Sequence, residues 1–187
     1  RAFAGSGLSG ELNLPAGLTT VIDQTFYECA SLTSLSIPTS LQSIGYEAFY
    51  GCGFEGALVI PEGVTTLDYQ AFGDCDSLTS ASIPLSLTAC EGSPFAYCDH
   101  LKQIILPEGM TELPNELFAY LNNLKDIELP DTLNSLGDCA FFGNEGLTSI
   151  TIPASISVIP SQCFYGCVNL EKVTALGTIV RIEDSAF

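Results

Sequence analysis

Proline recurs in this chain at a fixed interval of 23 residues. Seven of the ten prolines keep it: Pro15, Pro38, Pro61, Pro84, Pro107, Pro130 and Pro153. Nine of the eleven phenylalanines share one column of the same interval, and seven of them lie eleven residues after these prolines: Phe3, Phe26, Phe49, Phe72, Phe95, Phe118, Phe141, Phe164 and Phe187. One 23-residue unit cannot bury so many apolar side chains alone, so successive units must stack into columns of like residues. The period predicts a solenoid of about eight repeats.

Each unit contains a short alternating segment and a turn. In LTSLSIP, residues 32–38, Leu35 and Ile37 are expected to face the core while Ser34 and Ser36 face solvent. Equivalent strands should pair in parallel about 4.8 Å apart, and each ends at proline, which has no amide hydrogen for the ladder. Residues 39–45 allow a second short extended segment, and residues 46–54 a turn or single helical turn. We therefore expect a parallel strand ladder on one face and turns or short helical turns on the other.

The repeated phrase IPxxLxxIxxxAFxxCxxLTSLxIP resembles the BspA-like leucine-rich repeat family, and SIPTSLQSIGYEAFYGC at residues 36–52 is close to that family's consensus. The resemblance covers nearly the whole chain. We therefore expect residues 1–187 to form a single domain that is a piece of a longer repeat array. Two units depart from the pattern, because Phe54 and Leu8 stand one residue earlier than the leucine expected after the cysteine column. We expect these two units to repack their turns.

The charge of the chain excludes some partners. It carries 22 acidic and 5 basic residues, a formal net charge of −17, which repels nucleic acids and anionic lipid surfaces. We predict no nucleic-acid partner. No apolar run approaches the length of a membrane span, so we predict no membrane insertion, and these residues show no signal peptide. Most of the negative charge is expected to be a solvated surface.

Five of the eight cysteines occupy one column, fourteen residues after the proline: Cys29, Cys52, Cys75, Cys98 and Cys167. Leu121 and Asn144 interrupt the column, and the leucine indicates an apolar position. A buried free cysteine behaves as a small hydrophobic residue. We favour a reduced core ladder over disulfides or a metal centre, since paired CxxC spacing is absent. Cys139 is expected to be the most exposed thiol, and Cys139 with Cys163 is the one disulfide that merits a test.

No catalytic or cofactor motif is present. The neighbouring Cys98, Asp99 and His100 suggest a nucleophile and base, but adjacent turn residues point in different directions and the cysteine belongs to the core column. The chain has no G-x-S-x-G elbow, Walker loop or H-E-x-x-H motif. We predict no enzymatic activity and no cofactor. Turn carboxylates such as Asp74 and Asp76 allow weak divalent cation binding.

The outward residues of the strand ladder are the expected interaction surface, because they form one extended face on a rigid frame. The candidate residues for binding a partner protein are Ser34, Ser36, Val59, Ser80, Ser82, Gln103, Ile105, Asp126 and Glu128. The alternative is that serine and threonine stand there only as solvated strand residues. Another candidate surface is the column just after the core phenylalanine, which holds Tyr27, Tyr50, Phe142 and Tyr165 on the opposite face. These rings could equally pack between turns.

The leading hypothesis is a non-catalytic interaction or adhesion module with an unidentified protein partner. The family resemblance implies an extracellular or cell-surface location. The alternative is a structural spacer or accessory subunit of a larger assembly, which docks through open ends of the repeat stack.

Overall fold

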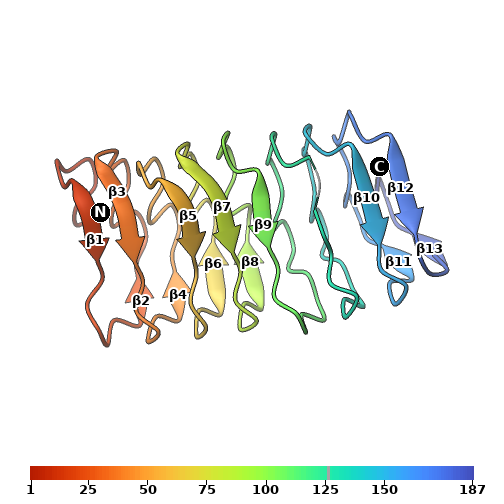
Figure 1. The fold of residues 1–187 in the computed structure, drawn as a ribbon, viewed down its shortest axis with the longest axis horizontal. Coiled ribbons are helices and arrows are strands. Elements are labelled where there is room, and N and C mark those ends of the chain that lie inside the picture. The colour runs from red at the N-terminus through yellow and green to blue at the C-terminus, as the bar shows by residue number, and fades with distance from the viewer. Residues whose placement is uncertain (126) are drawn as a thin grey trace.

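The computed structural model describes residues 1–125 and 127–187 and confirms the solenoid. Successive coils stack side by side along one axis, with short strands on two sides and turns elsewhere (Figure 1). The first strand column contains β1 (Gly10–Asn13), β3 (Leu32–Ser36), β5 (Gly56–Val59), β7 (Leu78–Ser82), β9 (Gln103–Ile105), β10 (Ser149–Ile152) and β12 (Lys172–Ala175). The second contains β2 (Thr20–Val21), β4 (Ser43–Ile44), β6 (Thr66–Asp68), β8 (Ala89–Glu91), β11 (Val158–Ile159) and β13 (Arg181–Ile182).

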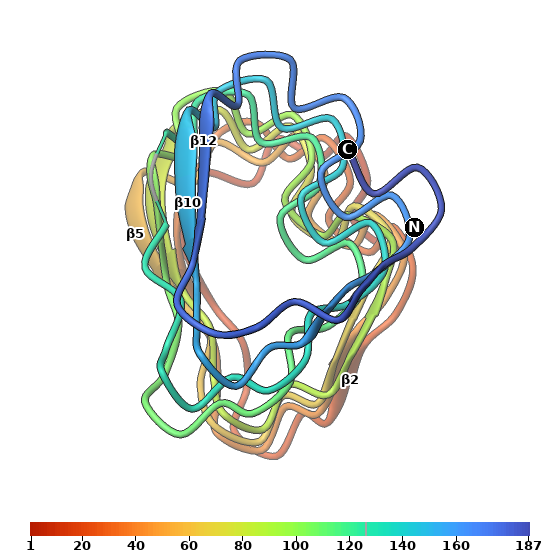
Figure 2. The same cartoon turned by 90° about the vertical axis from the view of Figure 1, so that its right-hand side faces the viewer.

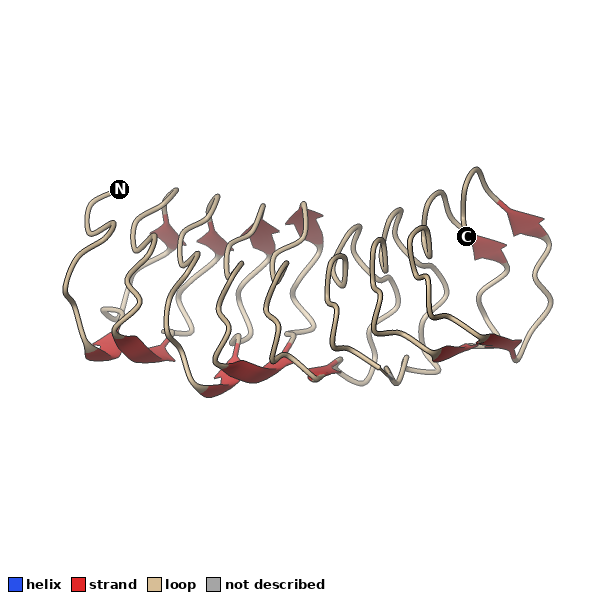
Figure 3. Cartoon of the chain, turned by 90° about the horizontal axis from the view of Figure 1, so that it is seen from above, coloured by secondary structure: helices blue, strands red, loops and turns tan. Residues whose placement is uncertain are grey.

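All strand pairs are parallel. Over residues 1–125 and 127–187 the first column, which we call the strand face, forms three sheets in the orders β1-β3, β5-β7-β9 and β10-β12. The second forms β2-β4-β6-β8 and β11-β13. In most pairs each residue lies beside its equivalent 23 positions along the chain, as Ser80 lies beside Gln103. The two ladders run along separate sides of the coil (Figure 3). Both expected extended segments are therefore confirmed.

Two prolines that lie off the 23-residue interval coincide with the breaks in the second ladder. Within the ladder, Gly45 N–H donates to Val21 O at 2.8 Å, and Glu183 N–H donates to Ile159 O at 2.9 Å. Pro114 and Pro160 occupy the same repeat position and have no N–H to donate. The ladder ends at β8 and resumes at β11, with one isolated bridge, Glu112 to Ser135, between them.

The turn segment carries a third set of bonds between coils. Gln24, Phe26 and Glu28 donate their N–H groups to the carbonyls of Tyr46, Ala48 and Tyr50 at 2.7 to 2.8 Å. Within a coil this segment contains three successive tight turns, in which Thr25, Tyr27 and Cys29 donate their N–H groups to Ile22, Gln24 and Phe26, and the described residues contain no helix. Of the two expected alternatives, the turn is therefore confirmed and not the helical turn. Viewed along the axis, the turns form an indented side opposite the strand face (Figure 2).

These turns place non-glycine residues in the left-handed region. Eleven of the described residues other than glycine have a positive φ: Gln24, Glu28, Glu47, Gln70, Asp74, Tyr97, Glu116, Tyr120, Cys139, Gln162 and Ser185. They fall in two columns, nine and thirteen residues after the repeat proline. Left-handed backbone costs L-residues about 1–2 kcal/mol each. The inter-coil bonds hold the backbone in this conformation.

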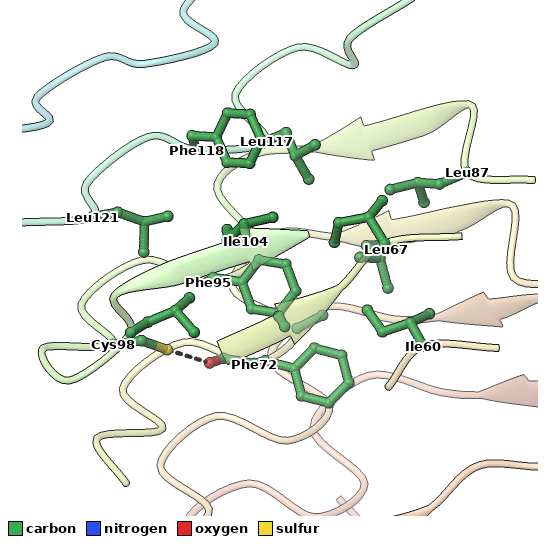
Figure 4. Close-up of a cluster of buried hydrophobic side chains, with 14 of the residues drawn as sticks. Ile60, Leu67, Phe72, Leu87, Phe95, Cys98, Ile104, Leu117, Phe118 and Leu121 are labelled. Carbon is green, nitrogen blue, oxygen red and sulfur yellow. Dashed lines mark hydrogen bonds between the residues drawn. The ribbon is translucent and has the colours of Figure 1, made fainter. Parts of the chain in front are cut away.

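The core is a stack of phenylalanine rings flanked by aliphatic columns. Rings stack with neighbouring centroids 5.1 to 5.7 Å apart from Phe3 to Phe95 and again from Phe118 to Phe187. Figure 4 shows Phe72, Phe95 and Phe118 among the leucines and isoleucines of adjacent coils. The predicted phenylalanine column is therefore confirmed as the core.

The cysteines of this column are buried free thiols, but the space that their side chains occupy is not simply apolar. Cys52, Cys75 and Cys98 each donate S–H to the carbonyl of the core phenylalanine one coil earlier, at 3.1 to 3.2 Å. Figure 4 marks this bond between Cys98 and Phe72. Asn144 also fits this space, since its Nδ2 donates to Phe118 O at 3.2 Å. The space therefore accommodates a small hydrogen-bond donor, which the apolar interpretation missed.

The two irregular units adjust by a bulge at the start of β1 and β5, where a repacked turn was expected. The register shifts between Gly10 and Glu11 and between Gly56 and Ala57. Both glycines have a positive φ. This conformation lets the strand pair in register although Leu8 and Phe54 stand one residue earlier than the equivalent leucines. Phe54 is buried and packs edge-on against Phe49 with ring centroids 5.7 Å apart.

Replacing Asn144 with cysteine should stabilise the fold. Asn144 is fully buried and its Oδ1 has no hydrogen-bond partner. Asn144→Cys keeps a donor for Phe118 O and removes the unpaired oxygen, so the free energy of unfolding should rise by about 1–2 kcal/mol. Urea denaturation measures it. Asn144→Leu loses the hydrogen-bond donor, so its free energy of unfolding should rise by less. If Asn144→Cys were no more stable than the parent, the idea that this position favours a small hydrogen-bond donor would be contradicted.

Glycine should be preferred over alanine at Asp74, where φ is +55°. Both substitutions remove the carboxylate, so their difference isolates the backbone conformation. Asp74→Gly should be more stable than Asp74→Ala by about 1 kcal/mol, measured by thermal or urea unfolding. The same pair at Asp76, whose φ is not positive, should show the opposite order. If the glycine variant were the more stable, or the less stable, at both sites, the result would argue against a left-handed conformation at Asp74.

Candidate interaction surface

The strand face presents most of its predicted residues to solvent. Val59 and Ile105 are 64% and 47% exposed, which is high for apolar side chains. Ser34, Ser36, Gln103 and Glu128 are exposed, and Ser80 and Ser82 are half-buried. Asp126 lies outside the described residues. The outward orientation expected from the alternating pattern is therefore present at the eight described positions.

Five of these residues lie on the one sheet formed by β5, β7 and β9. Val59 lies beside Ser82, and Ser82 lies beside Ile105. Ser80 and Gln103 form the neighbouring pair on β7 and β9. Adjacent strands lie about 4.8 Å apart, so the two apolar side chains flank a small serine on a hydrogen-bonded frame. This arrangement is the most apolar part of the predicted face.

Ser34 and Ser36 lie on β3, in a different sheet. Their ladder partners are Glu11 and Asn13 of β1. β3 and β5 are not paired, and next to this interruption the β5–β7 pairing shifts its register between Gly56 and Ala57. The structure therefore divides the predicted face rather than making it continuous.

A groove of ≈ 660 Å³ lies beyond β9, between that strand and residues 127–131. Gln103, Ile105 and Glu128 line it together with Lys102, Ile104, Leu106, Glu108, Ile127, Leu129, Pro130 and Asp131. Three predicted residues thus meet at one concave site with charged groups on its rim. This groove was not predicted from the sequence, because the repeat continues through it without insertion. The only signal was the acidic residue Glu128 at a strand position, which disfavours strand structure.

A second groove, of ≈ 430 Å³, lies on the other ladder at the break beside Pro114. Its lining includes Cys90 and Met110 of adjacent coils and Asn115. Burial raises the pKa of the Cys90 thiol to about 12, with a smaller contribution from Glu116. Cys90 is therefore protonated and a poor nucleophile near neutral pH.

The suspected Cys98 and His100 pair is not brought together as a catalytic unit. Cys98 is buried and donates to Phe72 O, and burial raises its pKa to about 12. His100 is exposed and its Nδ1 lies 2.7 Å from Asp76 O. Over residues 1–125 and 127–187, no group of three or more His, Cys, Asp or Glu side chains is placed to hold a metal ion. Weak cation binding by Asp74 and Asp76 stays a prediction.

The remaining cysteines are free thiols. Cys139 is half-buried, and its Sγ donates to Gln162 Oε1 at 3.4 Å. Cys163 is fully buried, and burial is the main cause that raises its pKa well above the ordinary value. Cys139 and Cys90 are both half-buried and the other cysteines are buried, so the prediction that Cys139 is the most exposed thiol stays a prediction.

The aromatic column of the turn side forms two separate stacks. Tyr27 and Tyr50 stack with ring centroids 5.2 Å apart, and Phe142 and Tyr165 do the same at 5.2 Å. Tyr165 is 47% exposed, while the other three rings are half-buried. These rings both pack between turns and present surface, so the two interpretations of this column hold together.

Comparison with known proteins agrees with this architecture. The model of the BspA type leucine rich repeat region matches residues 1–125 and 111–187, with six copies. Among the described residues, no helix is long and apolar enough to cross a membrane. No curated protein matches the chain.

Three solved bacterial structures are similar. A leucine rich cell surface protein of Faecalibacterium prausnitzii is 25% identical with a TM-score of 0.57, over 91% of this chain and 60% of that one. The T. pallidum leucine rich repeat protein is 25% identical with a TM-score of 0.59, over 92% and 72%. A Bacteroides ovatus leucine-rich repeat protein shares the fold at 23% identity and a TM-score of 0.57, over 95% and 63%.

The chain spans about 60% of the length of the F. prausnitzii and B. ovatus proteins. Its repeat interval, its parallel ladders and the family match over both halves agree with one another. The chain belongs to the BspA type leucine-rich repeat family.

Proposed function

We propose that this chain is a non-catalytic module that binds a protein partner through the β5-β7-β9 sheet and the groove beside it. The observation that carries the proposal is that Val59 of β5 and Ile105 of β9 are both exposed and flank Ser82 of β7 on one rigid sheet. Exposed apolar side chains on a fixed frame favour protein contacts, because their burial removes apolar area from water without a cost in ordering the backbone. Gln103 and Glu128 supply polar groups at the edge of the same groove.

A place at the cell surface fits this function. The F. prausnitzii protein of similar structure is described as a leucine rich cell surface protein. Leucine-rich repeat proteins are in general scaffolds for protein interaction rather than enzymes. We therefore propose an extracellular or cell-surface adhesion module.

The test is binding to a panel of purified extracellular matrix and bacterial surface proteins by surface plasmon resonance. At least one should bind the parent chain, and Ile105→Asp should weaken that binding by at least tenfold, because it places a charge in the contact. Ile22→Asp is the matched control, since Ile22 is 64% exposed but lies outside the strand face. No binding across the panel, or equal loss in both variants, would contradict the proposal.

A second proposal concerns the C-terminal end of the stack. β12 and β13 are the last strands of their sheets, and this end exposes Leu176, Ile182 and Phe187 at 58%, 60% and 56%. We propose that a further repeat of the same chain covers this end, so that residues 1–187 are a piece of a longer array. In that array the module also acts as a spacer or as a subunit of a larger assembly.

Intact mass spectrometry of the protein from its native source tests the longer array. We expect a mass well above the 19.8 kDa of these residues. A mass near 19.8 kDa would contradict the longer array.

A further inference from the structure

Four tyrosines gather on the turn side of the first coils, and we call them the tyrosine face: Tyr27, Tyr46, Tyr50 and Tyr69. The rings of Tyr46 and Tyr69 stack at 5.4 Å with an interplanar angle of 13°, and they are 39% and 41% exposed. Tyr27 and Tyr50 form the second stack. The two stacks share a coil, since Tyr46 and Tyr50 lie four residues apart in one turn segment.

The exposed stack of Tyr46 and Tyr69 has two different ends: the Tyr69 ring is covered by the next coil, and a carboxylate lies at the Tyr46 end. A Cβ added to Gly92 would lie within 2.4 Å of Tyr69 Cδ2, so the Tyr69 ring lies against the backbone of the next coil. At the other end, the same column position one coil earlier holds Asp23, which is exposed. Asp23 Oδ1 accepts a hydrogen bond from Tyr46 N–H at 3.1 Å. The open end of the stack therefore has a negative charge beside it.

Further carboxylates border the same rings. A hydrogen bond to Glu47 is the main cause that raises the pKa of Tyr46. For Tyr50, burial and then the charge of Asp74 raise the pKa to about 12. The tyrosine face thus combines exposed aromatic rings with carboxylates.

This combination selects a cationic partner. Arginine and lysine side chains are attracted to the faces of aromatic rings and to carboxylates. A second copy of the chain is an unsuitable occupant, because it carries 22 acidic and only 5 basic residues. Nucleic acid is repelled by the same charge. A basic segment of another protein satisfies both the rings and the carboxylates.

We propose that the tyrosine face binds a basic, arginine- or lysine-rich segment of a partner protein, with a cationic side chain on the open side of Tyr46 beside Asp23. Tyr46 and Tyr69 follow β4 and β6 of the second ladder, and Figure 2 shows that this ladder, marked by β2, lies across the coil from β5 and β10 of the strand face. The tyrosine face is therefore independent of the site proposed above. One module then holds two partners, or two parts of one partner, on opposite sides.

Fluorescence anisotropy with a labelled arginine–glycine peptide of about twelve residues tests the proposal at about 0.15 M salt, where the Debye length is about 8 Å. The parent chain should bind it, and a glutamate–glycine peptide of equal length should not bind. The double variant Tyr46→Ala with Tyr69→Ala keeps the net charge but should weaken binding by about tenfold, because it removes the ring faces. Tyr46→Phe should bind like the parent, since it keeps the ring. Circular dichroism and thermal unfolding check the folding of each variant.

Two control variants separate this site from the rest of the turn side and from the strand face. Tyr165→Ala removes an exposed, stacked ring from a distant part of the turn side and should leave the affinity unchanged. Ile105→Asp should not reduce peptide binding either, so failure of the strand-face proposal and failure of this one are distinguishable. Equal affinity of the parent and the double tyrosine variant would show that bulk charge alone attracts the peptide and would overturn the proposal. Absence of binding by the parent chain would overturn it as well.

Discussion

Backbone hydrogen bonds between successive coils are the interaction on which the rest of this structure depends. Successive coils are joined by bonds of the two strand ladders, which have breaks, and by bonds of the turns, and most paired residues lie 23 positions apart. The bonds require every coil to keep the same phase, since a shift of one residue would move core side chains to the surface. Where a unit is one residue out of phase, a glycine with positive φ restores the register.

The same constraint explains the chemistry of the core columns. The stacking of equivalent positions places each phenylalanine ring on the next, and it also brings the cysteine of one coil to the phenylalanine carbonyl of the preceding coil. A thiol fits this place because it is small, apolar in bulk and a weak donor. Burial raises the pKa of these thiols, so they remain protonated and inert. The cysteines therefore act as structural groups.

The two surfaces follow from the same stacking. The strand face repeats outward positions of the ladder, and its apolar pair at Val59 and Ile105 departs from the small polar residues around it. The tyrosine face repeats positions in the turns, where a ring stacks on the ring of the next coil. Repetition makes both surfaces regular, and the residues that differ between coils make one part of each surface chemically distinct from the rest.

The sequence by itself determined the period, the burial of the Phe and Cys columns, the parallel strands and the outward set that includes Val59 and Ile105. It could do so because these properties depend on the equivalence of positions, which a strict 23-residue interval displays directly. Only the tertiary structure decided which outward residues share a sheet. The breaks near Pro114 and in the unit before β5 depend on bonds to a neighbouring coil. The tertiary structure also decided the left-handed turns, the hydrogen bonds that the thiols donate and the groove beside β9. Each of these depends on contacts between neighbouring coils, and the sequence of a single coil does not show such contacts.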